Sequence, residues 1–300
     1  MTGMAQEDTS VQVAGRSAAG SSRMSRLLNR LPLHLTIVVI MAVWLIPTFG
    51  LFVNSFRSIT DMSSAGWWTA LFPPSNLTLD SYKQVLDTQG VAAGFVNSLI
   101  ITIPSTFLPI FLASLAAYAF SWLRFPFRDT LFLITIALLM VPIQVAFIPV
   151  LQLMRPFGLT QGYAGLWLAH TAFALPFGIF LLRNFFITLP KDLIEAARID
   201  GASSFGIFRR IVVPLSVPAI AAYGIFQFLW VWNDLLVALI FAQGQGTKPI
   251  TVQVLTLLGT YGSQWHILAA SAFLLMFLPL LVFFSLQRYF VQGLLAGSVK

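Results

Sequence analysis

The stretch from Leu189 to Pro218 reads LPKDLIEAARIDGASSFGIFRRIVVPLSVP and stands between two long apolar blocks. It holds three of the ten acidic residues of the protein, together with one lysine and three arginines. A charged side chain is costly inside a lipid bilayer, so a chain this apolar keeps its charges where they meet water or a partner. The stretch therefore indicates a loop outside the membrane between membrane-spanning segments.

The composition supports this interpretation. Of the 300 residues, 58% are hydrophobic and only 9% are charged, with a mean hydropathy of +0.85. Soluble domains carry about 25% charged residues. The sequence thus predicts an all-α polytopic membrane protein. It contains no cysteine, which excludes disulfides and thiolate metal sites.

Six apolar runs are long enough to cross a bilayer, at about 20 residues per crossing. We expect spans at about 33–53, 95–120, 130–151, 163–182, 216–241 and 265–286. The first run leads into Asn54 instead of a small-residue cleavage site, so it is read as a spanning helix and not as a signal peptide. Residues 1–30 are rich in Ser, Gly and Ala, which predicts a disordered tail ahead of a membrane domain of residues 31–300.

The distribution of basic residues predicts the orientation. Thirteen of the 17 Lys and Arg residues fall in the N-terminal tail, the second and fourth connections and the C-terminal segment. The other side holds Arg57, Lys83, Arg155 and Lys248. Cytoplasmic loops carry the excess of positive charge, so both termini and the charged loop are expected in the cytoplasm. Basic residues placed there fit anionic lipid better than nucleic acid.

The loop itself, residues 189–214, has the local signals of a helix, a tight turn and a second helix. Gly201 is expected to end the first helix, and Ser203 or Ser204 to cap the second. Pro214 is expected to close the second helix before the chain re-enters the membrane. Taken alone, such a hairpin also fits an amphipathic segment that rests its apolar side chains on lipid headgroups.

The spacing within the loop resembles the EAA coupling loop of ABC-importer permeases. The matching residues are Glu195, Ala196, Ala197, Gly201, Ile211 and Pro214. Val213 stands where that family usually has Leu. The segments 54–57, 232–234 and 287–297 are similar to MalG-like sugar permeases, a resemblance that covers residues 31–300. The run Gly66, Trp67 and Trp68 is similar to α-glucoside permeases.

The resemblance implies a type I ABC importer permease (MetI-like) fold with six transmembrane helices in the bacterial cytoplasmic (inner) membrane. It implies that the loop docks into a cleft on a cytoplasmic ATPase, which binds the ATP and magnesium. Arg198 and Asp200 join the six matching residues as accessory contacts. The implied partners are a second homologous permease, two ATPase subunits and an extracytoplasmic solute-binding protein, with a sugar as substrate.

The sequence lacks the residue patterns that nucleotide binding, metal binding and hydrolysis require. The chain has no GxxxxGK[ST] phosphate loop, so no nucleotide or other cofactor is expected in it. His34, His170 and His266 fall on different spans without carboxylates at ligand spacing, so no metal site is expected. A hydrolase could be assembled from Ser98, His170 and Asp234, but nothing in the local sequence indicates a nucleophile elbow or an oxyanion site. We therefore expect a subunit without catalytic residues.

Polar residues within the spans are the candidates for the translocation pathway. Asp234 is the only acid well inside a span, and its charge there costs on the order of 3 kcal/mol unless it meets partners or water. It either lines the pathway with Asn233 or makes a structural hydrogen bond between helices. The remaining candidates, each also explained by helix packing, are Gln227, Trp230, Gln144 and His170.

Proline residues within the spans predict kinks. These are Pro104, Pro109, Pro142, Pro149, Pro176 and Pro279.

Two other functions stay open beside sugar import. The first is an ABC permease for another solute, such as glycerol phosphate, a polyamine or an amino acid. The second is a secondary transporter or a membrane scaffold that transports nothing.

Overall fold

The computed structural model describes residues 21–71, 77–88, 90–244, 246–261 and 264–296. These residues belong to two compact units, 1–51 and 52–300. The expected disordered tail, residues 1–30, lies mostly outside the described residues. Its last part is already helical, because the first helix begins at Ser21.

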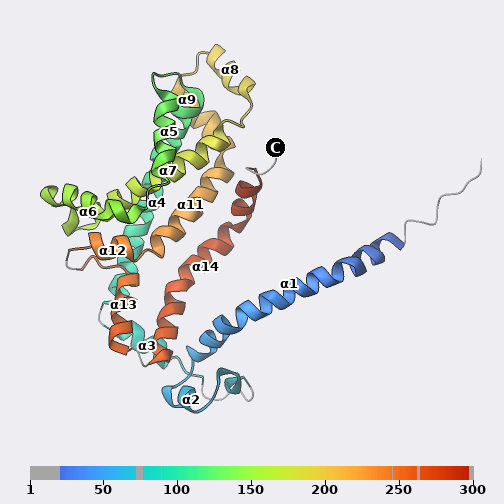
Figure 1. Cartoon of the computed structure of the whole chain (residues 1–300), viewed down its shortest axis with the longest axis vertical. Coiled ribbons are helices and arrows are strands. Elements are labelled where there is room, and N and C mark those ends of the chain that lie inside the picture. The colour runs from blue at the N-terminus through green and yellow to red at the C-terminus, as the bar shows by residue number, and fades with distance from the viewer. Residues whose placement is uncertain (1–20, 72–76, 89, 245, 262–263, 297–300) are drawn as a thin grey trace, which may run out of the picture. The chain divides into compact units, whose positions relative to one another are not determined.

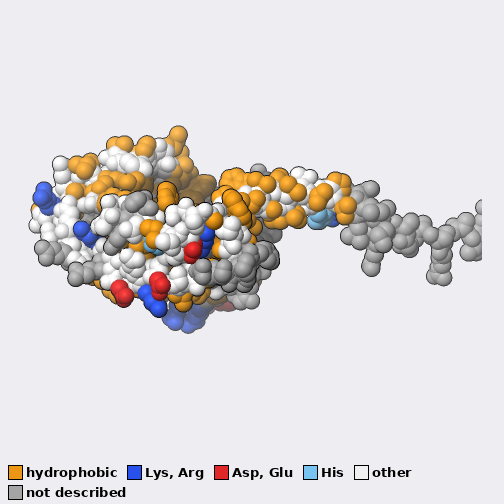
Figure 2. Space-filling view, turned by 90° about the horizontal axis from the view of Figure 1, so that it is seen from below, with side chains coloured by type: hydrophobic (Ala, Val, Ile, Leu, Met, Phe, Trp, Pro, Cys, Tyr) orange, Lys and Arg blue, Asp and Glu red, His pale blue; other side chains and the backbone are white. Residues whose placement is uncertain are grey.

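Helix α1 (Ser21–Asn54) contains a candidate span from Arg30 to Asn54, with a mean hydropathy of 2.4 over its most apolar window. Hydrophobic side chains cover most of the visible surface of this helix in Figure 2. At about 1.5 Å per residue, 25 residues give a rod of roughly 37 Å, more than the 30 Å thickness of the hydrocarbon core. The helix therefore has the length and composition to cross a membrane.

The second unit is built on the long helices α4 (Val91–Trp122), α7 (Tyr163–Phe186), α11 (Val217–Trp232) and α14 (Trp265–Ala296). Helix α4 packs along α7 and α11, and α14 packs along α11 (Figure 1). Small residues allow these close approaches: Ala113 and Ala117 of α4 are fully buried, and the ring of Tyr223 lies directly over Gly178. Small residues between spanning helices let their backbones approach.

Two of the expected spans are broken. Helices α5 (Arg128–Leu138) and α6 (Ile143–Met154) meet at 105°, and Pro142 stands at the start of α6. Four other prolines fall inside helices that continue past them. These are Pro104 and Pro109 in α4, Pro176 in α7 and Pro279 in α14. Pro149 falls inside α6. Among the described residues, four unbroken helices are long and apolar enough to span a membrane, or up to six if each bent pair is one span.

The expected fifth span, 216–241, is also interrupted. Helix α11 ends at Trp232, and a short helix α12 (Leu236–Phe241) follows after three residues. After α12 the chain leads into α13 (Ile250–Tyr261). Ser98 of α4 accepts the amide proton of Ile250 at 2.9 Å and so caps α13. Its hydroxyl is thus used in a structural contact.

The connection after α1 is folded around a buried arginine. Arg57 is only 4% exposed and donates to Asn54 Oδ1 and to the carbonyl oxygens of Asp61 and Ala65. These acceptors hold α2 (Ile59–Ser64) against the end of α1. The 3₁₀ turn Trp67–Ala70 and α3 (Asp80–Asp87) complete this side, which the charge distribution predicts to be extracytoplasmic.

Candidate functional site

The first helix of the charged loop is α8 (Lys191–Ile199), and it ends as the sequence predicts. Gly201 has a φ of +79°, in the left-handed region that favours glycine. The amide of Gly201 donates to the Arg198 carbonyl at 3.1 Å, and the amide of Ala202 donates to the Ala197 carbonyl at 2.9 Å. This pair of bonds is a Schellman motif, which satisfies the last carbonyl groups of a helix.

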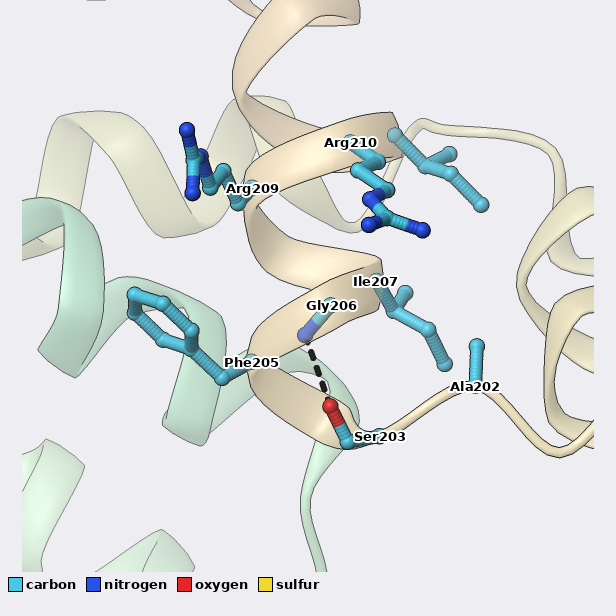
Figure 3. Close-up of a pocket in the computed structure, with 8 residues that line it drawn as sticks. Ala202, Ser203, Phe205, Gly206, Ile207, Arg209 and Arg210 are labelled. Atoms are coloured by element: carbon cyan, nitrogen blue, oxygen red, sulfur yellow. Dashed lines mark hydrogen bonds between the residues drawn. The ribbon is translucent and has the colours of Figure 1, made fainter.

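The second helix begins at a serine cap. Ser203 Oγ accepts the amide proton of Gly206 at 3.1 Å at the start of α9 (Ser204–Ile207), as the dashed line in Figure 3 shows. A π-helical turn (Phe208–Val212) and α10 (Val213–Leu215) follow.

The second helix ends at Leu215, one residue after Pro214, so the proline lies in its last turn, close to where it was expected to close the helix. The chain bends by 77° between Leu215 and Val217, at Ser216. The loop therefore runs directly into α11.

One face of the loop is buried in the helical unit. Ile194 of α8 and Val212 are fully buried, and Ile207 and Phe208 are nearly so. They form one apolar cluster with residues of α4, α7 and α11, namely Tyr118, Leu182, Phe186 and Tyr223. The rings of Phe208 and Tyr118 lie 5.4 Å apart. Close packing of these interior side chains attaches the loop to the three helices.

A hydrogen bond makes a second link between the loop and α4. Arg198 Nη2 donates to the carbonyl oxygen of Trp122, the last residue of α4, at 2.7 Å. Its positive charge thereby lies at the negative end of that helix. Arg198, expected as an accessory contact to a partner, is already bonded within its own chain.

The opposite face of the loop is open. Glu195, Ala196 and Asp200 are exposed, and Glu195 takes part in none of the ion pairs formed by the described residues. Large apolar side chains lie beside them, with Ile199 at 86% and Phe205 at 60% exposure. An apolar surface rimmed by charge is typical of a site for another protein.

A shallow cavity of about 270 Å³ lies on the second helix of the loop. In Figure 3, Phe205 and Arg209 point to one side of the helix, and Ile207 and Arg210 point to the other. Of the remaining predicted residues, Ala197 and Ile211 are half-buried against the apolar cluster and Pro214 is exposed. The sequence interpretation missed Ile194, Phe208 and Val212 as site residues. The i, i+3, i+4 spacing of Phe208, Ile211 and Val212 was a usable signal for one helical face.

Asp234 lies at the break between α11 and α12. Its carboxylate accepts the amide protons of Val237 at 3.3 Å and Ala238 at 3.0 Å, so it caps α12. Its carbonyl oxygen accepts from Thr251 Oγ1 at 2.8 Å, which ties the break to α13. His170 Nε2 lies 3.9 Å from Asp234 Oδ2, too far for a hydrogen bond. These contacts give the carboxylate a structural use.

The other pathway candidates divide into buried and exposed residues. Gln227 is buried and donates to the Ser105 carbonyl at 2.9 Å, and the ring of Trp230 meets the ring of buried His170 edge-on. Gln144 and Asn233 are exposed, although Gln144 was expected to be buried. Gln144 stands at the start of α6, just after the sharp bend between α5 and α6.

No group of three or more His, Cys, Asp or Glu residues able to hold a metal ion occurs among the described residues. The buried polar residues are instead spread over many elements, among them α3, α4, α7, α11, α13 and α14.

Comparison with known proteins gives consistent matches. Residues 109–295 match the family described as binding-protein-dependent transport system inner membrane component. The osmoprotective compounds uptake permease protein GgtD of a Synechocystis strain is 50% identical over 284 residues, covering 93% of this chain and 95% of that protein. The alpha-glucoside transport system permease protein AglG of Rhizobium meliloti is 48% identical over 259 residues, covering 82% and 68%.

A solved structure has the same fold. It is the crystal structure of a bacterial ABC transporter involved in the import of the acidic polysaccharide alginate, with a TM-score of 0.76 at 20% identity. The match covers 89% of this chain and 98% of that one. The MetI-like permease fold that the resemblance implied is thereby confirmed, and the expected six crossings fit the described helices if each bent pair is one span.

Proposed function

This chain belongs to the family of inner membrane components of binding-protein-dependent transport systems, and from that premise we propose that it is the permease subunit of an ATP-driven sugar importer. It forms half of the translocation pathway beside a second homologous permease. Two ATPase subunits bind ATP and magnesium on the cytoplasmic side, and a solute-binding protein delivers the substrate from the other side.

The observation that carries this proposal is the two-faced loop of residues 189–214. Its open face presents Glu195, Ala196 and Asp200 to an ATPase. Its buried face packs through Ile194 and Phe208 into α4, α7 and α11. Closure of the ATPase pair moves the loop, the loop moves these helices, and the pathway opens outward. Hydrolysis returns it to the inward-open state.

Within the loop, each feature has a defined task. The exposed carboxylate of Glu195 offers a charge-assisted hydrogen bond to a basic residue of the ATPase. Ala196 permits close approach of the two proteins. Gly201 sets the turn that holds the two short helices at their angle.

The substrate is proposed to be an α-linked glucoside. The support is the 48% identity to the alpha-glucoside permease AglG, together with the run Gly66, Trp67 and Trp68. Polar side chains beside the helix breaks, Asn233 and Gln144 among them, are exposed and able to meet sugar hydroxyl groups. The structural contacts of Asp234 support bracing of the pathway in preference to direct sugar contact.

A second candidate substrate is a small osmoprotective compound. The relative GgtD, at 50% identity, is named for the uptake of such compounds. Both candidates use the same pathway and the same loop, so they differ only in the solute.

A binding screen of the cognate solute-binding protein separates the two. Titration calorimetry is carried out against maltose and isomaltose, which are α-glucosides, and against glycine betaine, an osmolyte that contains no sugar. Tight binding of an α-glucoside alone supports the first candidate, and tight binding of an osmolyte alone supports the second. Binding of neither, with tight binding of an amino acid or polyamine, contradicts both.

A further inference from the structure

Two arginines lie where α5 begins and α7 ends, on the side predicted to be cytoplasmic. Arg128 is the first residue of α5, and Arg183 lies in the last turn of α7. The guanidinium of Arg183 stacks on the ring of Phe132, 3.9 Å from its centroid. Phe132 lies one helical turn after Arg128 on α5, so this stacking places Arg183 beside Arg128. Two like charges are thus held together at the edge of the helical unit.

The acid that accompanies this cluster is Asp129. Its Oδ1 accepts from Arg128 Nε at 3.0 Å, but its side chain is 81% exposed. An exposed ion pair of this kind contributes little, because water screens both charges. The cluster therefore keeps a net positive charge.

Hydrogen-bond donors at the same ends of the helices lack acceptors. Arg183 Nε and Trp122 Nε1 are both buried without a hydrogen-bond partner in the part of the chain that the structure describes. A buried donor without an acceptor costs about 1–3 kcal/mol. In addition, Phe127 precedes α5 without a side-chain cap, so the first amide groups of this helix are open to a ligand.

The surroundings of the cluster are apolar and exposed. Phe127, with a φ of 60°, is 77% exposed at the tip of the turn. Leu131, Leu133 and Ile134 of α5 are 45–65% exposed, and none of the residues of this helix is buried. An anion with a long apolar tail therefore finds donors at the turn and an apolar surface along α5.

We propose that Arg128, Arg183 and the first turn of α5 bind the phosphate group of an anionic phospholipid in the cytoplasmic leaflet. Guanidinium groups match phosphate oxygens in geometry and charge. A free phosphate ion offers the same oxygens, but the apolar flank of α5 favours the lipid. The assignment to the cytoplasmic leaflet rests on the membrane placement in the proposed function; the binding itself does not.

The test uses the purified importer complex in detergent, depleted of native lipid. The shift in thermal unfolding midpoint is measured while dioleoyl phosphatidylglycerol, dioleoyl phosphatidylcholine or inorganic phosphate is titrated. We expect saturable stabilisation by phosphatidylglycerol only. Arg128→Gln and Arg183→Gln are each expected to raise the apparent Kd about fivefold, and the double variant about 25-fold, since one basic residue near anionic lipid contributes about 1 kcal/mol.

Arg155→Gln is the matched control, because Arg155 is an exposed arginine outside this cluster. It should leave the apparent Kd unchanged. Each shift is compared within one variant, with and without lipid, so a variant that is less stable from the outset still reports its binding. Should Arg183→Gln fail to assemble, Arg128→Gln alone carries the test.

An unchanged Kd in both single variants overturns the proposal, as does equal stabilisation by phosphatidylcholine. Stabilisation by inorganic phosphate that matches phosphatidylglycerol overturns the lipid assignment. The titration needs no sugar and no transport, so its outcome is independent of the substrate screen.

Discussion

Replacement of Gly201 by alanine tests whether the loop is a coupling device or a passive hairpin. No atom lies within 4 Å of the position that a Cβ at Gly201 would take, so the substitution adds no clash. Its cost comes from the backbone alone. The φ of +79° is unfavourable for an L-residue by about 1–2 kcal/mol, which lowers the population of the native turn by a factor of about 5–30.

The assay compares ATP hydrolysis and sugar uptake in proteoliposomes that hold the complete importer. We expect Gly201→Ala to reduce the sugar transported per ATP hydrolysed, because the exposed face of α8 loses its fixed angle. Gly201→Asn is expected to be milder, since asparagine tolerates the left-handed region better than alanine does.

Gly158 provides a matched control. Its φ is +68°, no atom lies within 4 Å of its added Cβ, and it stands in the turn after α6, outside the loop. Gly158→Ala therefore imposes a similar backbone cost elsewhere. The reasoning is refuted if Gly201→Ala transports like the wild type, or if Gly158→Ala loses coupling to the same degree.

Four further predictions follow from the contacts described above. Glu195→Arg should leave the protein in the membrane but abolish coupled uptake, because a partner's basic residue would face a like charge; normal uptake contradicts this. Asp234→Ala should cost about 1 kcal/mol through the lost cap of α12, measured as a lower unfolding midpoint, whereas Asp234→Asn keeps one of the two acceptor oxygens and should cost less. A changed sugar affinity with unchanged stability would instead favour a pathway role. Gly178→Ala should lower the yield of assembled complex on size exclusion, because its Cβ would meet the ring of Tyr223; assembly as in the wild type would show that α7 and α11 can yield. Because the protein has no cysteine, Thr188→Cys and Gln161→Cys should react with a membrane-impermeant thiol reagent from opposite sides of the membrane, and labelling from the same side contradicts the predicted orientation.

The amino-acid sequence by itself determined the features that depend on local chemistry. Apolar runs of spanning length follow from hydropathy alone, so the described helices lie close to the expected spans. The end of α8 at Gly201 and the cap at Ser203 follow from hydrogen bonds between residues five or fewer positions apart. These signals need no knowledge of distant parts of the chain.

Tertiary structure decided the uses of the polar and apolar residues that those elements carry. Arg198 is bonded to Trp122, 76 residues earlier in the chain, and Gln227 to Ser105, 122 residues earlier. Nothing in the local sequence distinguishes these side chains from ones that face a partner or a substrate.

The breaks in the third and fifth expected spans also depend on tertiary structure. Pro142 coincides with a sharp bend, while Pro104 lies inside the continuous helix α4. A proline permits a bend, but the packing of neighbouring helices decides whether the freed carbonyl group is satisfied in place. The two short helices of the loop between Leu189 and Pro218, and the turn between them, could therefore be predicted from the sequence. The packing of the loop against α4, α7 and α11 is seen only in the folded chain.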